Sequence, residues 1–294
     1  MFYRRKVILA VIEIFGGTIE KIALQKLLLL FTKRQVKPDY DFVPYHYGCY
    51  SFSANADLTA MVKHGILLEN DKFFSKNDST GYASKLSAID KKILIETFDA
   101  YGKMSSNSLM KHSYLNFHYY AVNSKIAKDL LSGEEFEKVQ NAKPKSNDTI
   151  LFTIGYEGIS LEEYLNRLIK NDVKVLVDVR NNPQSMKFGF SKSQIKKYCE
   201  SLGIEYLHIP EVGIQASFRQ ELKSQADYDK LFIHYKATTL SETQTYQEII
   251  LKLLVEKKRI ALTCFEANIC QCHRKHLSEA ITLLPNWNYT LKHI

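Results

Sequence analysis

Val-Lys-Val-Leu-Val-Asp-Val-Arg, residues 173–180, is the stretch that decides the fold of the second half of the chain. It is rich in β-branched residues and almost continuously apolar, which is typical of a strand covered on both faces. Similar short runs lie before and after it, and stretches of helical periodicity separate them. Strands that alternate with helices predict an α/β domain with a mostly parallel, Rossmann-like sheet and right-handed crossovers.

This predicted α/β domain covers residues 149–294. The runs expected to form strands are residues 150–154, 173–179, 204–209, 259–265 and 289–294. Helices are expected after the capping residue Ser160 and over residues 191–201, 246–257 and 272–284.

Polar or glycine residues follow the apolar runs, and this position is the main functional signal. These residues are Gly155, Tyr156 and Glu157; Asp178 and Arg180; His208 and Glu211; and Cys264 and Glu266. Ligands of open α/β sheets bind outside the carboxyl ends of the strands. The sequence therefore predicts a polar site, suited to an anion, at this edge of the sheet.

Arg180 directly follows the deciding strand, and its guanidinium offers a fork that matches phosphate or carboxylate. The alternative is a structural ion pair with Glu157, Glu211 or Glu266. Asp178 is two residues away and is expected on the same face as Arg180. Asp178 joins the predicted site on that basis.

Each of the other candidates in the predicted site also has a non-functional, structural interpretation. Arg219 lies in the loop after Gly213 and could bind an anion, although a loop arginine is usually solvated. Tyr156 and Tyr206 could stack on a base or simply pack. The three glutamates Glu157, Glu211 and Glu266 could act as general acid or base, or satisfy loop amides and Arg180.

Cys272-His273-Arg274 stands where a helix is expected to begin. A thiol at a helix N-terminus beside cationic residues can have a lowered pKa and act as a nucleophile. The alternative is an inert buried thiol whose neighbours fix the loop. Cys264, at the end of an apolar strand, is expected to be a core residue.

A metal centre is weighed at the same segment. The candidate ligands are Cys264, Cys270, Cys272, His273 and His276. Structural zinc sites usually combine two Cys-x2–4-Cys knuckles, whereas this segment has Cys-x-Cys-His and the chain has no second knuckle. We therefore expect no metal. Walker A and Gly-x-Gly-x-x-Gly sequences are absent, and we expect no nucleotide or other cofactor.

The α/β domain resembles the uncharacterised bacterial domain family numbered 488 among the domains of unknown function. The motifs that carry the resemblance are residues 153–158, Asp178-Val179-Arg180 with Pro183 and Ser185, Phe190-Ser191, residues 203–211 with Gly213, residues 264–266 and Cys272-His273-Arg274. The chain departs from the family at Val212 and at Asn268-Ile269. The resemblance implies a fold and a site, with roles linked to nucleic acid or bacterial defence, but no settled reaction.

Residues 1–132 have mainly helical periodicity. Helices are expected over residues 4–15, from a cap at Thr18 through the Leu-rich run, from Ser53 or Asn55 to His64, and over residues 86–101 and 105–131. A hairpin is expected around Asn70-Asp71. Helices followed by a hairpin predict a winged-helix-like domain. The polar residues 133–148 that follow it are expected to form the linker.

The first domain resembles the helical domain of Panacea-type antitoxins. Leu24-Gln25-Lys26-Leu27-Leu28 and residues 42–51 carry this resemblance. It implies a domain that reads DNA or binds a protein. The third expected helix offers only Lys63 and His64 as basic groups, which is poor for contacts with phosphate. Binding of a protein partner is therefore as well supported as binding of DNA.

The composition is that of a globular protein. The 294 residues are enough for two domains, with 45% hydrophobic and 24% charged residues. Five unevenly spaced cysteines do not form a disulfide framework, no apolar run is long enough to cross a membrane, and no leader is recognisable, so we expect a cytoplasmic protein. The net charge of +8 is modest evidence for a polyanionic partner.

Two functions fit these patterns. The first is an enzyme that acts on a phosphate-bearing or nucleic-acid substrate, with Arg180 and Arg274 holding the anion. Cys272 would then be the nucleophile, and Glu266 or His273 would move protons. The second is a non-catalytic module, in which the first domain binds protein or DNA and the α/β domain senses a small anionic ligand.

Overall fold

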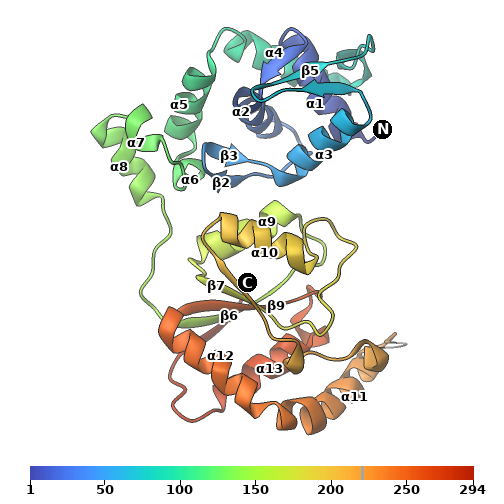
Figure 1. Cartoon of the computed structure of the whole chain (residues 1–294), viewed down its shortest axis with the longest axis vertical. Coiled ribbons are helices and arrows are strands. Elements are labelled where there is room, and N and C mark those ends of the chain that lie inside the picture. Colours follow the sequence, from blue (N-terminus) through green and yellow to red (C-terminus); the bar gives the residue numbers. More distant parts are fainter. Residues whose placement is uncertain (220–221) are drawn as a thin grey trace. The chain divides into compact units, whose positions relative to one another are not determined.

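The computed structural model describes residues 1–219 and 222–294, without the side chains of residues 216 and 219 (Figure 1). The chain forms two compact units, Met1–Lys143 and Pro144–Ile294, and residues contact one another mainly within each unit. We call them the helical unit and the α/β unit. Among the described residues, no helix combines the length and apolar character needed to cross a membrane.

The α/β unit contains a five-stranded sheet in which every pairing is parallel. Its strands are β6 (Ile150–Gly155), β7 (Val175–Asp178), β8 (Glu205–His208), β9 (Arg259–Cys264) and β10 (Thr290–His293). Each forms within one of the five predicted runs, give or take a residue. The prediction of an α/β domain with a parallel sheet is confirmed.

Helices cover both faces of this sheet. They are α9 (Leu161–Lys170), α10 (Lys192–Ser201), α11 (Gln225–Tyr235), α12 (Gln244–Lys257) and α13 (His273–Thr282). Short helical turns occur at Pro210–Val212, Ala216–Arg219, Lys236–Leu240 and Ile269–Gln271. In Figure 1, α9 and α10 lie on one face and α12 and α13 on the other. The sequence predicted these four helices but not α11.

The strand order, β10-β6-β9-β7-β8, places the late strand β9 between two early ones. The connections that leave β6 and β7 lead to α9 and α10 on one face, whereas the connection that leaves β9 leads to α13 on the opposite face. The chain therefore turns to one face of the sheet after β6 and β7, and to the opposite face after β9. Such a reversal opens a crevice at the carboxyl ends of the strands.

The core of the α/β unit explains why β7 is so apolar. All four residues of β7 are buried. Val175 and Val177 point to the face where Leu254 of α12 and Leu277 of α13 pack. Burial of each large aliphatic side chain contributes about 1.5–3 kcal/mol, so the layers around β7 hold the sheet in place.

The helical unit consists of eight helices and two small antiparallel sheets among its residues 1–143, all of which are described. The helices are α1 (Tyr3–Ile14), α2 (Lys21–Thr32), α3 (Phe52–Lys63), α4 (Ala88–Tyr101), α5 (Ser106–Asn116), α6 (His118–Ala121), α7 (Ala127–Leu130) and α8 (Gly133–Asn141). A single-turn helix spans Ala83–Lys85. One sheet has the order β1 (Thr18–Glu20), β5 (Phe73–Lys76), β4 (Leu67–Glu69), and the other pairs β2 (Val43–Tyr45) with β3 (Gly48–Tyr50).

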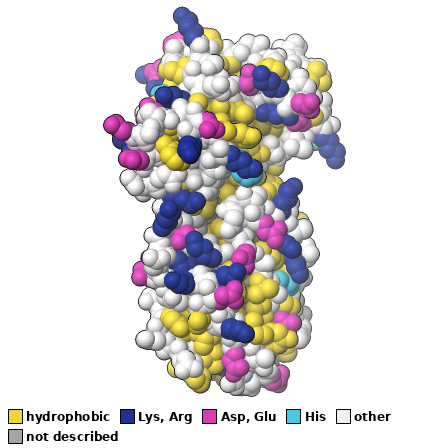
Figure 2. Space-filling model, turned by 60° about the vertical axis from the view of Figure 1, so that its left-hand side comes forward, with side chains coloured by type: hydrophobic (Ala, Val, Ile, Leu, Met, Phe, Trp, Pro, Cys, Tyr) yellow, Lys and Arg dark blue, Asp and Glu magenta, His cyan; other side chains and the backbone are white. Residues whose placement is uncertain are grey.

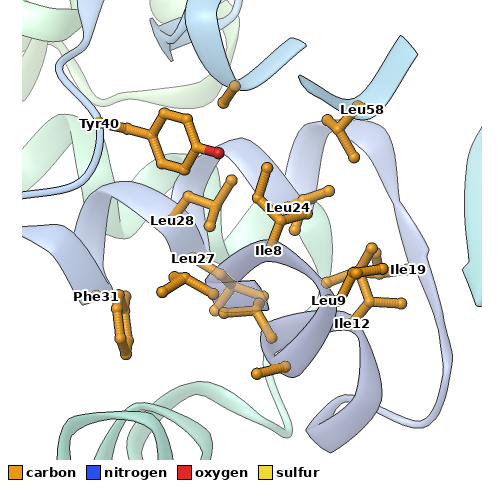
Figure 3. Packing of buried hydrophobic residues seen from close by; sticks show 14 of the residues in the cluster. Ile8, Leu9, Ile12, Ile19, Leu24, Leu27, Leu28, Phe31, Tyr40 and Leu58 are labelled. Atoms are coloured by element: carbon orange, nitrogen blue, oxygen red, sulfur yellow. The ribbon is translucent and has the colours of Figure 1, made fainter. Parts of the chain in front are cut away.

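The core of the helical unit is built by the apolar faces of α1 and α2. Ile8, Ile12, Leu24 and Leu28 are fully buried there and pack in one cluster with Leu58 of α3 (Figure 3). The hairpin predicted around Asn70-Asp71 is confirmed, because β4 and β5 pair across it.

Three local predictions in the helical unit are wrong. Thr18 does not cap a helix but begins β1, because Ile19 pairs with Phe74 of β5. The single helix expected over residues 105–131 is broken into α5, α6 and α7, and Phe117 has non-helical backbone angles (φ −139°, ψ 62°) at the first break. The predicted linker 133–148 begins with helix α8, so the irregular connection is shorter than expected.

Local chemistry explains why α8 forms in a polar segment. The Ser132 side chain accepts a hydrogen bond from the backbone of Glu135, and the Glu135 carboxylate accepts one from the Ser132 backbone. This reciprocal capping box satisfies two backbone donors that would otherwise lack partners. Val139, on the inner side of α8, is buried against Tyr114 and Ala121.

Lys26, on α2, is a buried lysine with an unusual environment. Its ammonium is almost completely buried and donates a hydrogen bond to the carbonyl oxygen of Cys49 over 3.0 Å. Burial lowers the pKa of Lys26, because the charged form loses its hydration. The same ammonium lies beside an apolar pocket of about 160 Å³ that Tyr45 and Tyr50 help to line.

This burial predicts a pH dependence of stability. The unfolded chain keeps the ordinary lysine pKa of about 10.4 and so binds more protons than the folded chain between the two pKa values. The free energy of unfolding of the wild type should therefore rise with pH in that window relative to Lys26→Met, by at most about 1.4 kcal/mol per pH unit. Urea denaturation followed by circular dichroism measures this difference. Lys92→Met, which removes an exposed lysine and keeps Lys26, should show the same slope as the wild type.

Candidate functional site

A pocket of about 340 Å³ lies at the carboxyl ends of β6, β7 and β9. Tyr156 enters it from the end of β6, Arg180 from β7 and Cys264 from β9. The other residues that line it are Asn181, Asn182, Gln184, Ser185, Met186, Ile214 and Phe265. The pocket thus lies where the strand order reverses the direction of the chain. The structure brings strand-end residues of three of the four strands predicted to supply the site to this pocket, and neither His208 nor Glu211 is among the described residues that line it.

Arg180 forms a buried ion pair with Asp178, two residues before it. Its Nε donates to Asp178 Oδ1 over 2.8 Å, and its Nη2 donates to Asp178 Oδ2 over 2.5 Å. Its Nη1 donates to the Tyr156 hydroxyl over 2.7 Å and to the carbonyl oxygen of Phe190 over 2.9 Å. Burial alone lowers the pKa of a guanidinium, but Asp178 raises it, so Arg180 stays charged.

The ion pair corresponds to the structural alternative for Arg180, with a different partner. The sequence analysis named Glu157, Glu211 and Glu266, whereas the carboxylate that binds Arg180 is Asp178. An aspartate and an arginine two residues apart at a strand end share one face of the sheet, so their side chains meet locally. Anion binding by Arg180 stays a prediction, and it would involve a guanidinium whose charge Asp178 already balances.

The two tyrosines of the predicted site have distinct surroundings. The ring of Tyr156 stacks on Phe190 with 4.2 Å between centroids and contacts Phe265 edge-on. Tyr206 is half-buried and donates its hydroxyl to Asp178 Oδ2 over 2.7 Å. Both rings therefore support the Arg180 ion pair, and Tyr156 also forms part of the pocket wall.

A cluster of thiols and imidazole lies against the same pocket. Ligand atoms of Cys264, Cys272 and His273 lie within 4.8 Å of one another, and all three residues are buried. The Sγ of Cys264 lies 3.5 Å from Nδ1 of His273 and donates to Oε2 of Glu266 over 3.1 Å. The other ring nitrogen of His273, Nε2, lies 3.0 Å from the carbonyl oxygen of Val179. We call Cys264, Cys272 and His273 the thiol–imidazole cluster.

Cys272 lacks the features of a nucleophile. It is fully buried at the start of α13 and is absent from the pocket lining. Burial raises its pKa well above the ordinary thiol value, and neighbouring Cys264 and Glu266 raise it further. A thiol with a raised pKa is mostly protonated at neutral pH. The thiol that lines the pocket is Cys264, which the sequence analysis had assigned to the core.

The remaining predicted residues lie around the cluster or apart from it. Arg274 is buried and donates to the carbonyl oxygens of Glu266 and Ala267. Glu157 is exposed and accepts a hydrogen bond from the backbone of Ala267. Glu211 is exposed, and it is not among the described residues that line the pocket. The side chain of Arg219 lies outside the described part of the chain.

The sequence analysis missed the loop that supplies most of the pocket's polar side chains. Asn181, Asn182, Gln184 and Ser185 follow Arg180 directly and bring amide and hydroxyl groups to the pocket. The available signal was their position, since a polar run that follows a buried strand lies at the ligand-binding edge of an open sheet. Ser185 is held by its backbone, which donates to Ser191 over 3.1 Å.

Thiol reactivity provides a direct check on this arrangement. Cys270 is exposed, whereas Cys49, Cys199, Cys264 and Cys272 are buried. We expect a disulfide reagent to modify one thiol per chain quickly and the others at least about a hundredfold more slowly, because buried thiols react only after local opening. Cys270→Ser should remove the fast phase. A fast phase that persists in Cys270→Ser and maps to Cys272 would restore the nucleophile hypothesis.

Comparison with known proteins identifies only the α/β unit. No curated protein matches the chain. Residues 160–281 match the family model described as domain of unknown function DUF488. The matched segment runs from the residue that caps α9 to the last turn of α13, and it includes Arg180, Cys264 and the Cys272-His273-Arg274 motif. Over residues 160–281, the α/β unit of this protein therefore resembles the DUF488 domains.

Proposed function

We propose that the α/β unit is an enzyme that acts on a phosphate-bearing substrate held in the pocket at the carboxyl ends of β6, β7 and β9. The observation that carries the proposal is the convergence of Tyr156, Arg180 and Cys264 on one pocket at the strand ends. Groups that can move protons, Glu266 and His273, lie directly beside the Cys264 thiol. A nucleotide or the end of a nucleic acid is the substrate class that we favour.

Hydrogen bonding in the pocket supports a phosphate ligand more than a purely apolar one. The amides of Asn181, Asn182 and Gln184 can donate to phosphate oxygens, and Arg180 keeps a positive charge near them. Phe265 is partly exposed at the rim and offers a surface for a base or sugar. These groups favour a ligand with an anionic end and a flat or apolar end.

One observation favours a second function, in which the α/β unit senses its ligand without changing it. The guanidinium of Arg180 is occupied by Asp178, Tyr156 and Phe190. A guanidinium fixed in this way shapes the pocket, but it stabilises a developing charge less than an arginine that is not already paired would. Turnover of the bound ligand distinguishes the two functions.

The helical unit is proposed to bind a partner. Its order of α1, β1, α2, the small β2–β3 sheet, α3 and the β4–β5 hairpin, with β1 pairing to β5, supports a winged-helix domain. Basic and acidic side chains are interspersed on the face that Figure 2 shows. The exposed side of α3 ends in Lys63 without a further basic row, so we favour a protein partner over DNA. The free thiols support a cytoplasmic setting, and bacterial defence is the role that we expect there.

The test measures ligand binding and turnover by the full chain. Inorganic phosphate, nucleotides, sugar phosphates and short DNA and RNA are screened by thermal shift, and the mixtures are analysed for products by chromatography. Asn182→Asp places a negative charge in the pocket and should weaken binding of the ligands found by about tenfold or more. Asn182→Ala removes the same amide without adding charge and should have a smaller effect.

Lys174→Gln is the matched control, because it also changes the net charge by one but lies just before β7, at the opposite end of that strand from the pocket. Product formation by the wild type would support the enzyme, and binding without product would support the sensor. If no phosphate-bearing compound binds, or if Asn182→Asp behaves like Lys174→Gln, the proposed function is wrong.

A further inference from the structure

The thiol–imidazole cluster has the composition and spacing of a metal centre. Two thiols and an imidazole are ligands that Zn²⁺ prefers, and their ligand atoms all lie within 4.8 Å of one another. A tetrahedral zinc ion with Zn–S of about 2.3 Å and Zn–N of about 2.0 Å separates a sulfur from a nitrogen ligand by about 3.5 Å. The Sγ of Cys264 and Nδ1 of His273 are 3.5 Å apart.

The hydrogen bond of His273 prepares its other nitrogen for a metal. A carbonyl oxygen only accepts, so the contact with Val179 requires a proton on Nε2 of His273. The neutral ring then presents the lone pair of Nδ1 toward Cys264. Metal-binding histidines usually donate their second ring N–H to a carbonyl or carboxylate in this way, which fixes the tautomer and the ring plane.

Glu266 is the candidate for the fourth ligand, and its carboxylate would have to turn toward the cluster, because the three ligand atoms that lie within 4.8 Å of one another do not include it. Its Oε2 lies 3.1 Å from the Sγ of Cys264, and the residue is half-buried directly after β9. Cys272 and His273 come from the start of α13, whereas Cys264 and Glu266 come from the end of β9 and the loop after it. The spacing in the sequence disfavoured zinc because it shows no second Cys-x2–4-Cys knuckle. In the fold, the end of β9 lies beside α13 and takes the place of that knuckle.

Charge also favours a bound cation with thiolate ligands. Two thiolates, one carboxylate and one Zn²⁺ leave one net negative charge. The guanidinium of Arg274 is buried next to the cluster, and its Nε is buried without a hydrogen-bond partner among the described residues. The N-terminus of α13, a helix of ten residues, lies at the same place and favours negative charge. Arg274 and α13 therefore complement a metal-bound cluster better than neutral thiols.

We propose that Cys264, Cys272 and His273 bind a zinc ion, with Glu266 as the fourth ligand. Because Cys264 also lines the pocket, the ion would lie in the pocket wall. There, exchange of Glu266 for a substrate oxygen would provide the exchangeable fourth position that catalytic zinc sites have. The metal site does not depend on the proposed substrate, since its ligands are a self-contained set.

Metal content tests this proposal without an activity assay. When the full chain is expressed with added zinc, we expect elemental mass spectrometry to find about one zinc ion per chain. Cys264→Ser, Cys272→Ser and His273→Gln should each lower the zinc content about tenfold or more. Cys270→Ser is the matched control, since it removes an exposed thiol from the same segment and should leave the zinc content unchanged.

Cobalt binding to the wild type provides a readout that does not depend on the stability of the variants. After zinc is removed by a chelator, Co²⁺ added to the wild type should give the visible bands of a tetrahedral ion and a near-ultraviolet thiolate charge-transfer band. Binding should release about two protons, because both thiols ionise. Glu266→Gln should keep the charge-transfer band but shift the visible bands.

Several outcomes overturn the assignment. A wild type that holds neither zinc nor cobalt has no such centre, and cobalt bound without the charge-transfer band is bound elsewhere. Zinc retained in both cysteine variants excludes these ligands, and an unchanged cobalt spectrum in Glu266→Gln excludes Glu266. None of these results bears on phosphate binding, which Asn182→Asp tests separately.

Discussion

Gly155→Ala should lower the free energy of unfolding of the α/β unit by about 3 kcal/mol, one of the two largest effects that we expect in this chain. A Cβ at this position would lie 2.0 Å from the carbonyl oxygen of Glu266 and 3.0 Å from Nη2 of Arg274. The carbonyl belongs to the backbone, which cannot move aside like the end of a flexible side chain. The end of β6 would have to separate from the loop after β9.

That separation would also disturb the site. The backbone N–H groups of Tyr156 and Glu157 both donate to the carbonyl oxygen of Phe265, which holds the two loops together. Urea denaturation followed by the fluorescence of Trp287, the single tryptophan, reports on the α/β unit. Gly158→Ala is the control, because Gly158 has a positive φ of 77° but no atom near its Cβ position. It should cost about 1 kcal/mol, and equal losses in the two variants would contradict the steric argument.

Asp178→Ala should have a comparable effect, a loss of about 3–5 kcal/mol. Asp178 is fully buried, and its carboxylate binds Arg180 and the hydroxyl of Tyr206. Its removal leaves the Arg180 charge buried without a counter-charge, and the desolvation penalty of that charge is no longer offset. The same fluorescence assay measures the change.

Two further variants separate this explanation from a general loss of packing. Glu200→Ala breaks an exposed pair with Lys196 on α10 and should cost less than about 0.5 kcal/mol. The double variant Asp178→Ala with Arg180→Met removes both charges and should be more stable than Asp178→Ala alone. A double variant as unstable as the sum of its single variants would show that the buried charge is not the cause.

The sequence predicted the α/β unit well because its strands are strong local signals. A nearly continuous apolar run such as residues 173–179 has few alternatives to a buried strand, and Ser160 marks a helix start because its hydroxyl accepts a hydrogen bond from the backbone N–H of Glu163. Helix α8 was missed for the opposite reason. It has few apolar residues, and its stability depends on a capping box and on the burial of Val139.

The candidate site was predictable in position but not in composition. The strand ends pointed to the edge of the sheet where the pocket lies, because all parallel strands end on one side. The order of the strands is a tertiary property, and it alone places Cys264 beside His273 and moves Glu211 away from the pocket. The pairing of Arg180 with Asp178 is local, but several carboxylates lie near strand ends, and the sequence alone does not determine which of them pairs with Arg180.

The position of β9 also affects the order of events during synthesis. β6 pairs with β9 and β10, and β7 pairs with β8 and β9, so the two early strands share no hydrogen bonds with each other. While the ribosome is translating residues 156–258, β6 has no neighbour to pair with, and its apolar edge must remain exposed or be shielded by a chaperone. The two early strands of the nascent α/β unit can therefore join one sheet only after residues 259–264 have left the exit tunnel.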